Sequence, residues 1–308
     1  MRVFITGASG HVASAVVPEL LNHGHQVLGL ARSDESAAKV SALGAEVRRG
    51  DITDLDLLSK SAAEADGVIH LAFRHDIAFS GDFAGAADSD QAAIKVIGQA
   101  LAGSGKPFIG TGGSLFVAGE YPAKLGTEQD AGSGPNPRTA SERALLGLSS
   151  EGVRSANVRL APVVHSDLDK HGFISILINF ARENGFAAYV GEGKNRWPGA
   201  NTRDIGVLYR LALEKAPAGS ALHGVESEGY AFRTIAEAIA AKLGLEARSI
   251  SAEEANQRLG FLAQFAQADN PTSNRWTRET LGWEPTHPGL LEDLAAEHYF
   301  SETHEVLG

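Results

Sequence analysis

A glycine-rich loop near the N-terminus is the first segment whose residue types indicate a specific chemistry. It reads Thr6-Gly7-Ala8-Ser9-Gly10-His11-Val12-Ala13 and stands between a β-branched run and an apolar helical pattern. Glycines in such a turn let the backbone approach a diphosphate, and the following helix offers free N–H groups and the positive end of its dipole. This context predicts a dinucleotide site and not merely a tight turn. The expected contacts in the loop are Gly7, Ser9, Gly10, His11 and Val12.

The end of the second predicted strand indicates which dinucleotide is bound. A site for NAD usually places an acidic side chain there, where it accepts a hydrogen bond from the ribose 2′-hydroxyl. This chain has Arg32 and Ser33 instead, and a guanidinium beside a hydroxyl suits a 2′-phosphate. We therefore expect NADP in preference to NAD, the alternative being that Arg32 is an ordinary surface arginine. The next residue, Asp34, is expected to cap the helix that follows.

The elements that must position these loops alternate between strand and helix, which predicts parallel βαβ units. The fold class is therefore α/β, a doubly wound parallel sheet of the Rossmann type, with its ligand site at the carboxyl ends of the strands. The predicted strands are Arg2–Ile5, Gln26–Leu30, Glu46–Arg49, Gly67–Leu71, Pro107–Ile109 and Ser155–Leu160. The predicted helices between them are Val12–Asn22, Glu35–Leu43, Leu55–Ala63, Gln91–Leu101 and Thr139–Ser149.

After Leu160 the pattern becomes mostly helical. We expect a dinucleotide-binding domain over residues 1–165 and a smaller substrate lobe over 166–308, interleaved with the first. Residues 126–137 and 191–199 are rich in glycine and proline and are expected to be long loops. The predicted helices of this half are Phe173–Glu183, Ile205–Leu213, Thr234–Leu243 and Leu290–Tyr299, with short strands near Ala188–Val190 and Leu222–Val225.

Composition excludes several function classes. The 308 residues carry a net charge of −11, which disfavours nucleic acid and anionic membranes as partners. The absence of cysteine excludes disulfides, thiolate nucleophiles and cysteine-ligated metals. Neither a metal-ligand spacing nor a membrane-length apolar run stands out, so we expect a cytoplasmic protein without a metal.

Six short segments, spread over nearly the whole chain, follow one another in an order typical of one family. They are Thr6–Ala13, Gly50–Ile52, Leu71–Phe73, Arg159–Val164, Arg203–Ile205 and Leu281–Pro285. Taken together, they resemble the extended branch of the short-chain dehydrogenase/reductase superfamily, which includes epimerases, dehydratases and 3β-hydroxysteroid dehydrogenase-like proteins. The resemblance implies further cofactor contacts at Asp51, Ile52, Leu71, Ala72, Phe73, Thr111, Pro162 and Val164.

The family's proton relay is incomplete in this chain. Ser114 matches the residue that hydrogen-bonds the substrate oxygen, but Arg138 stands where the family has tyrosine and Glu142 where it has lysine. Arginine cannot give up a proton in this pH range, and a carboxylate cannot stabilise a tyrosinate. The two residues are four apart on a predicted helix and are expected to pair with each other. Arg138 is also a candidate substrate contact.

Other residues offer replacements for the missing donor. His165 follows the Pro162 turn near the expected nicotinamide, the alternative being a loop histidine that points to water. His75 lies beside Asp76, which would orient its ring. Tyr121 lies in the loop after Ser114 and is a candidate substrate contact, the alternative being a packing residue.

A second set of residues is expected to contact the substrate. Arg196 and Trp197 lie in the loop over 191–199 and offer a charge and a flat apolar face. Trp197 is equally suited to packing the lobe against the sheet.

The leading hypothesis is an NADP-dependent oxidoreductase for an unidentified small molecule, with Ser114, His165 and His75 as catalytic candidates. One alternative is a sensor that holds NADP without turnover. Another is an epimerase- or dehydratase-like enzyme that retains its cofactor. A homodimer is expected because dimers built on pairs of helices are common in the superfamily.

Overall fold

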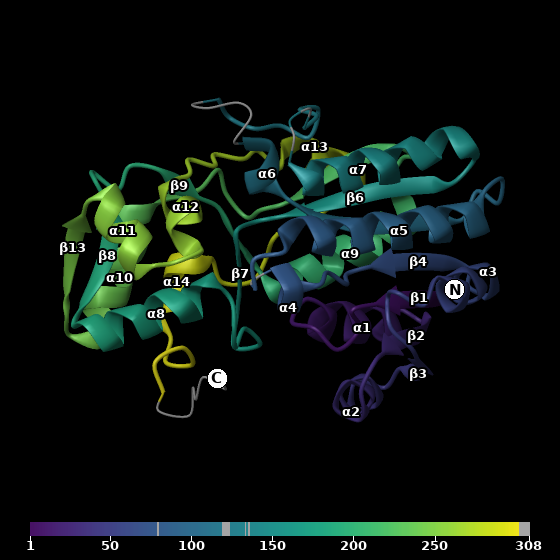
Figure 1. Cartoon of the computed structure of the whole chain (residues 1–308), viewed down its shortest axis with the longest axis horizontal. Helices are drawn as coiled ribbons and strands as arrows, with labels where there is room; N and C mark the ends of the chain where they lie inside the picture. Colours follow the sequence, from purple (N-terminus) through teal and green to yellow (C-terminus); the bar gives the residue numbers. More distant parts are fainter. Residues whose placement is uncertain (79, 119–123, 133, 135, 302–308) are drawn as a thin grey trace.

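A computed structural model describes the chain except for residues 79, 119–123, 133, 135 and 302–308. Its main body is a seven-stranded parallel sheet in the order β11-β6-β5-β4-β1-β2-β3, which confirms the predicted Rossmann-type fold (Figure 1). The strands are β1 (Arg2–Thr6), β2 (Gln26–Ala31), β3 (Glu46–Arg49), β4 (Gly67–His70), β5 (Pro107–Gly113), β6 (Arg154–Leu160) and β11 (Ser220–Gly224).

Helices cover both faces of the sheet and bury its apolar side chains. One core lies under α1 and α9, and another lies under α3, α5 and α7. The helices of this body are α1 (Ala13–Asn22), α2 (Asp34–Ala42), α3 (Leu55–Glu64), α4 (His75–Ala78), α5 (Phe83–Leu101), α6 (Ser114–Ala118), α7 (Pro137–Gly147) and α9 (Thr202–Lys215). Because α9 and β11 come after residue 165 yet belong to this layer, the chain returns to the sheet after leaving it.

The C-terminal lobe has its own core and lies on the left of Figure 1. Two-stranded pairings between β13 and β8, β12 and β9, and β10 and β7 hold its chain segments together. Its helices are α8 (Phe173–Asn184), α10 (Phe232–Leu243), α11 (Ala252–Arg258), α12 (Leu262–Gln267) and α14 (Leu290–Ala295). Helix α13 (Arg275–Leu281) returns to the sheet body and packs against α9 and β11. Its strands are β7 (Val163–His165), β8 (Phe186–Val190), β9 (Arg196–Trp197), β10 (Gly199–Asn201), β12 (Tyr230–Ala231) and β13 (Glu246–Ile250).

Several predicted boundaries were wrong. Helix α5 begins at Phe83 and not at Gln91, because its first turns are rich in alanine and lack an apolar period. Strand β5 continues to Gly113, beyond the predicted end at Ile109. The predicted turn at 162–164 contains strand β7, and the predicted loop over 191–199 contains strand β9. These strands escaped prediction because each is short and paired only with another short strand.

The two family-like segments of the second half pack against each other. The buried indole of Trp283 donates a hydrogen bond from Nε1 to the carbonyl oxygen of Asp204 (2.9 Å). The Asp204 carboxylate accepts hydrogen bonds from the backbone N–H groups of Thr286 (3.0 Å) and His287 (3.1 Å). This contact fixes the segment after α13 against the start of α9, so the C-terminal segment helps to hold the sheet's helical layer.

The described residues contain neither a membrane-spanning helix nor a metal-binding group of side chains. No helix there is long and apolar enough to cross a membrane. No group of three or more histidine, aspartate or glutamate side chains in that part of the chain is arranged to hold a metal ion.

Replacement of Trp283 by phenylalanine should lower the free energy of unfolding by about 1–3 kcal/mol, because the variant loses a buried hydrogen bond and part of a fully buried ring. Urea unfolding monitored by circular dichroism measures the change. The matched control is Trp276→Phe, on the half-buried face of α13, where the loss should be smaller. Equal losses in the two variants would contradict a special role for the Trp283 contact.

Candidate cofactor and substrate site

The glycine-rich loop is built for close contact with the end of strand β4. Gly7 has a positive φ of 69°, and a Cβ placed on it would lie 2.7 Å from the backbone nitrogen of Ala72. Any larger residue would therefore be strained and would also push the two segments apart. The N–H of Leu71 donates to the carbonyl of Thr6 (3.2 Å), and the N–H of Ala72 donates to the Thr6 hydroxyl (3.3 Å). The predicted contacts of the loop and of residues 71–73 thus lie side by side.

The start of helix α1 fits an anionic ligand. Val12 occupies the N-cap position and has no side chain that accepts a hydrogen bond from the first turn. Helices α2, α3 and α5, in contrast, are capped by the side chains of Ser33, Asp54 and Asp82. A helix N-terminus preceded by a tight glycine turn and lacking its own cap is suited to a diphosphate.

The carboxyl ends of β2 and β3 bring two arginines together. Arg32 is largely exposed and forms an ion pair with Asp76 (3.2 Å). Arg49 of β3 is the register partner of Ala31 at the end of β2. Its guanidinium donates to the carbonyl of Ser33 and pairs with Asp34 (2.9 Å). Sequence reasoning missed Arg49, because only the strand register places it next to Arg32.

Ser33 and not Asp34 caps helix α2. The Ser33 hydroxyl accepts a hydrogen bond from the N–H of Ser36 (3.1 Å), and the Ser36 hydroxyl accepts one from the N–H of Ser33 (2.9 Å). The prediction that Asp34 caps this helix was wrong, because the reciprocal serine pair occupies that position.

The remaining predicted cofactor contacts also lie near the carboxyl ends of the strands. Asp51 accepts hydrogen bonds from both the N–H and the hydroxyl of Thr53, and Ile52 is buried in the core under α3. Pro162 immediately precedes β7, where Val164 pairs in register with Ala200 of β10.

A buried polar network runs beneath the glycine-rich loop. The Thr6 hydroxyl lies 2.6 Å from Nδ1 of His70, and Nε2 of His70 lies 3.1 Å from Asp90. Arg138 donates to the other oxygen of Asp90 (2.7 Å) and to the carbonyl of Thr111 (2.6 Å). Burial by itself raises the pKa of Asp90, but the hydrogen bond from His70 and the charge of Arg138 outweigh it and hold the pKa below its ordinary value.

Arg138 and Glu142 do not pair with each other, so that expectation was wrong. Glu142 instead accepts hydrogen bonds from Nε (2.9 Å) and Nη2 (2.5 Å) of Arg159 and from Nδ2 of Asn157 (2.6 Å). Both charges of α7 point into the fold, Arg138 toward α5 and Glu142 toward β6. The positions of the family's tyrosine and lysine are therefore occupied by two separate buried ion pairs.

Thr111 joins the first of these pairs to helix α9. Its hydroxyl donates to the carbonyl of His70 (2.8 Å) and lies 2.7 Å from the hydroxyl of Tyr209. Since this side chain is already engaged, its predicted role as a cofactor contact would fall to its backbone.

Ser114 begins helix α6 and is almost fully buried, with 3% of its surface exposed. Its Oγ accepts a hydrogen bond from Nδ2 of Asn270 (2.8 Å). Asn270 belongs to the segment between α12 and α13, so the predicted substrate-binding serine contacts the C-terminal lobe.

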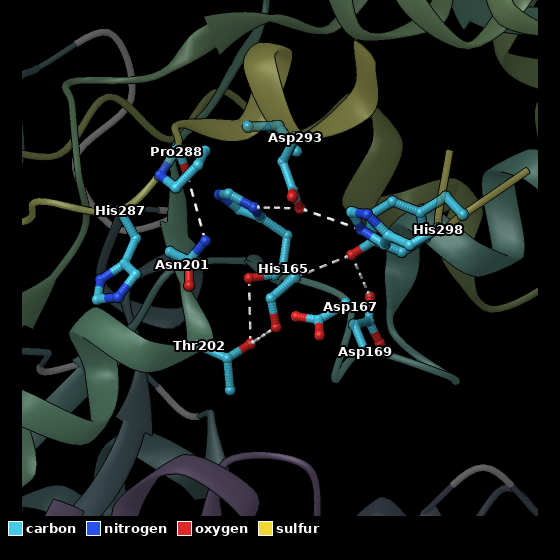
Figure 2. A network of polar contacts seen from close by, with 12 residues as sticks. His165, Asp167, Asp169, Asn201, Thr202, His287, Pro288, Asp293 and His298 are labelled. Carbon is cyan, nitrogen blue, oxygen red and sulfur yellow. Dashed lines mark hydrogen bonds and ion pairs between the residues drawn. The ribbon is translucent and has the colours of Figure 1, made fainter. Parts of the chain in front are cut away.

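His165 lies inside the protein and does not point to water, so the loop-histidine alternative was wrong. Its Nδ1 is 2.9 Å from Asp293 and its Nε2 is 3.1 Å from Glu226; Figure 2 shows the contact with Asp293. Burial alone would lower the pKa of His165, but the hydrogen bonds and charges of the two carboxylates raise it to about 9. At neutral pH the ring is therefore an imidazolium between two carboxylates.

His11 connects the glycine-rich loop to the C-terminal lobe. Its Nε2 lies 2.8 Å from the hydroxyl of Thr202, which donates to the carbonyl of His165 (3.1 Å). A hydroxyl has one proton, so Nε2 of His11 must carry the proton of this contact. Nδ1 lies 4.0 Å from Asp169, but burial outweighs that charge and lowers the pKa of His11.

His75 lies in α4 with its ring edge against Phe73 (5.2 Å between centroids), while the guanidinium of Arg138 lies over the same Phe73 ring (4.3 Å). Burial, and then the charge of Arg138, lower the pKa of His75. Asp76 accepts hydrogen bonds from Arg74 and Arg32, which gives its carboxylate partners other than the His75 ring.

The predicted substrate contacts Arg196 and Trp197 have structural partners. Trp197 is fully buried, with its ring edge against Phe232 (4.8 Å between centroids), which favours the packing interpretation. Arg196 forms an ion pair with Asp269 (2.9 Å). Tyr121 lies outside the described residues.

Comparisons with known proteins agree with this arrangement. A family model described as NAD(P)H-binding matches residues 7–135. The structure of a dTDP-glucose 4,6-dehydratase from Streptomyces venezuelae with NAD bound superposes with a TM-score of 0.76 at 17% identity, covering 96% of each chain.

Relatives extend along nearly the whole chain. An uncharacterized protein of Schizosaccharomyces pombe is 43% identical over 301 residues, which are 97% of this chain and 100% of that protein. One from Saccharomyces cerevisiae is 41% identical over 302 residues, covering 97% and 99%. The chain belongs to one family with these two proteins. It shares the NAD(P)H-binding segment and the fold of the extended short-chain dehydrogenases/reductases, with buried ion pairs at the tyrosine and lysine positions.

The free energy of unfolding should fall as the pH rises from about 6.5 to above 9. The pKa of His165 is about 9 in the folded chain and about 6.5 as its ordinary value, so its stabilisation is complete below the lower value and lost above the upper one. The difference corresponds to about 3 kcal/mol. Urea unfolding at several pH values measures it.

The control for this titration is His23→Gln, which removes an exposed histidine and should keep the pH dependence of the parent. His165→Gln should flatten the curve in the same interval. A curve that keeps its slope in this variant would show that other groups cause the pH dependence.

Proposed function

We propose that this chain is an NADP-dependent oxidoreductase that acts on the carbonyl or imine of a small molecule. The observation that carries the cofactor preference is the pair of arginines at the ends of β2 and β3, where Arg32 and Arg49 flank the helix cap at Ser33 and each has an aspartate partner. Two guanidinium groups beside a helix N-terminus favour a 2′-phosphate over a bare ribose hydroxyl. The NAD bound to the related dehydratase supports a dinucleotide at this edge of the sheet.

The residues that fit a dinucleotide are the uncapped start of α1 and the glycine turn before it. When bound, the nicotinamide group supplies or accepts a hydride. Ser114, at the end of β5, is the residue that would hydrogen-bond the substrate oxygen. Arg138 would keep its charge throughout, because guanidinium stays protonated at neutral pH.

His75 is the remaining candidate for the proton donor. It lies beside the Phe73 ring on which Arg138 stacks, at the same edge of the sheet as the end of β4. Because the pKa of His75 is lowered, its protonated ring is populated mainly at a pH below the one at which an ordinary histidine titrates. A histidine donor would therefore work best at mildly acidic pH, and solvent is the alternative source of the proton.

A sensor without turnover is the second candidate, and the buried ion pairs favour it. Arg138 and Glu142 replace the two groups that move and tune the proton elsewhere in the family, and both are locked to internal partners. This arrangement preserves the fold and the cofactor site without the usual chemistry. The activity assay below separates the two functions.

Replacement of Arg32 by alanine should weaken NADPH binding by roughly 10- to 100-fold and leave NADH binding nearly unchanged, because only the former carries the 2′-phosphate. Titration calorimetry with both nucleotides measures the two affinities. Arg48→Ala is the control, since Arg48 lies on the neighbouring strand β3 and pairs with Glu64 at the end of α3. Equal losses for both nucleotides would refute the 2′-phosphate assignment.

The purified protein should oxidise NADPH in the presence of at least one aldehyde, ketone, imine or quinone, followed by the loss of NADPH absorbance. Ser114→Ala should lower kcat/KM by about 100-fold or more, because the variant loses the hydrogen bond to the substrate oxygen. His75→Gln, tested across pH, distinguishes a histidine donor from solvent. Tight NADPH binding without turnover on any class would favour the sensor.

A further inference from the structure

The contact between Ser114 and Asn270 joins two residues that are 156 positions apart. Both are buried, Asn270 completely. Nδ2 of Asn270 donates to Oγ of Ser114, while the Thr272 hydroxyl donates to Oδ1 of the same amide (3.0 Å). Both ends of the Asn270 amide therefore have a partner, and its orientation is held by Thr272.

The backbone around Asn270 is anchored to strand β9. The N–H of Asn270 donates to the carbonyl of Arg196 (2.9 Å), and the N–H of Arg196 donates to the Asp269 carboxylate (2.7 Å). Nη2 of Arg196 adds a second bond to that carboxylate (2.9 Å). Asn195 holds the same segment from the other side, since its Nδ2 donates to the carbonyls of Ala266 (3.0 Å) and Ala268 (3.1 Å).

These contacts give Arg196 a role that differs from the one expected from the sequence. Its guanidinium fixes Asp269, the residue just before Asn270, and the carboxylate lies beside the Arg196 backbone. The hydrogen bonds to Arg196 lower the pKa of Asp269, so the pair stays ionised over the physiological range. The placement of Asn270 thus depends on β9 and not on an adjustable loop.

The direction of the hydrogen bond matters for chemistry. A serine hydroxyl has one proton, and an Oγ that accepts from Asn270 keeps that proton for another acceptor. The family's tyrosine, which would share the task of holding the substrate oxygen, is replaced here by Arg138, whose Nη groups are bound to Asp90 and the carbonyl of Thr111. Ser114 therefore receives its orientation from the C-terminal lobe and not from α7.

We propose that Asn270 is a positioning residue, which turns the Ser114 proton away from the protein and toward the oxygen of a carbonyl or imine substrate. The proposal rests on the proposed oxidoreductase function for its consequence in catalysis. Its structural part, the donation from Asn270 to the side chain at position 114, is testable without turnover.

The absence of cysteine from the chain makes a direct test available. The Ser114→Cys variant introduces a single thiol, and the ultraviolet absorbance of its thiolate reports its pKa in the folded protein. A donor aimed at the sulfur favours the thiolate. Asn270→Asp in the same background replaces the donor by an acceptor of equal size, and should move the thiol titration upward by about one pH unit or more.

The matched control is Asn274→Asp, which makes the same chemical change in the same segment. Nδ2 of Asn274 donates to the carbonyl of Val225 (2.6 Å), so this variant loses a bond that does not involve position 114. The thiol should then titrate as in the Ser114→Cys parent. Asn270→Ala serves if the aspartate variant does not fold, because it also removes the donor and should also raise the titration midpoint.

Kinetics with native Ser114 test the catalytic consequence. Asn270→Asp should lower kcat by roughly 10- to 100-fold while NADPH affinity stays close to that of the wild type, because the Ser114 proton would turn toward the new carboxylate. Asn270→Ala, which adds no buried charge, should lower kcat in the same direction. A thiol titration that does not respond to either Asn270 variant overturns the proposal. Unchanged kcat in a folded Asn270→Asp variant also overturns it. A wild-type protein without any turnover refutes the oxidoreductase function instead, and the thiol titration then decides whether Asn270 donates to position 114.

Discussion

The requirement that a buried charge must have a partner governs the centre of this molecule. Helix α7 carries an arginine and a glutamate one turn apart, both turned into the fold. A buried ion without compensation costs several kcal/mol, so each needs its own counter-charge. Asp90 of α5 meets Arg138, and Arg159 of β6 meets Glu142. These two pairs attach α7 to a helix on one side and to the sheet on the other.

The same requirement limits the chemistry available at the end of β5. Removing Arg138 or Glu142 would leave Asp90 or Arg159 buried without its counter-charge, so the family's tyrosine and lysine cannot be restored singly without cost. Any turnover must therefore use groups outside α7. Ser114 is such a group, and its hydrogen bond comes from Asn270 of the C-terminal lobe. The site thus depends on contacts that cross between two parts of the chain.

The sequence was sufficient for the fold, because its signals are local. A glycine turn between a strand and a helix and repeated strand–helix alternation are each contained in short segments. The partners of Arg138 and Glu142 were not predictable in this way. These partners lie 48 and 17 residues away in the sequence. The spacing of four residues along the helix indicated only a pair between Arg138 and Glu142. The single charged residue within the predicted strand Ser155–Leu160 was the one signal in the sequence for Arg159.

The imidazolium of His165 extends this reasoning to the way the two parts of the chain are held together. It ends strand β7 and lies between Glu226, which follows β11, and Asp293 of α14. The adjacent Thr202 hydroxyl contacts His11, so the glycine-rich loop is one side chain away from this cluster. Protonated His165 neutralises one of two buried carboxylates and hydrogen-bonds both. The contacts that hold α14 against β7 are therefore strongest where His165 is charged, a range that includes the mildly acidic pH at which His75 would serve best as an acid.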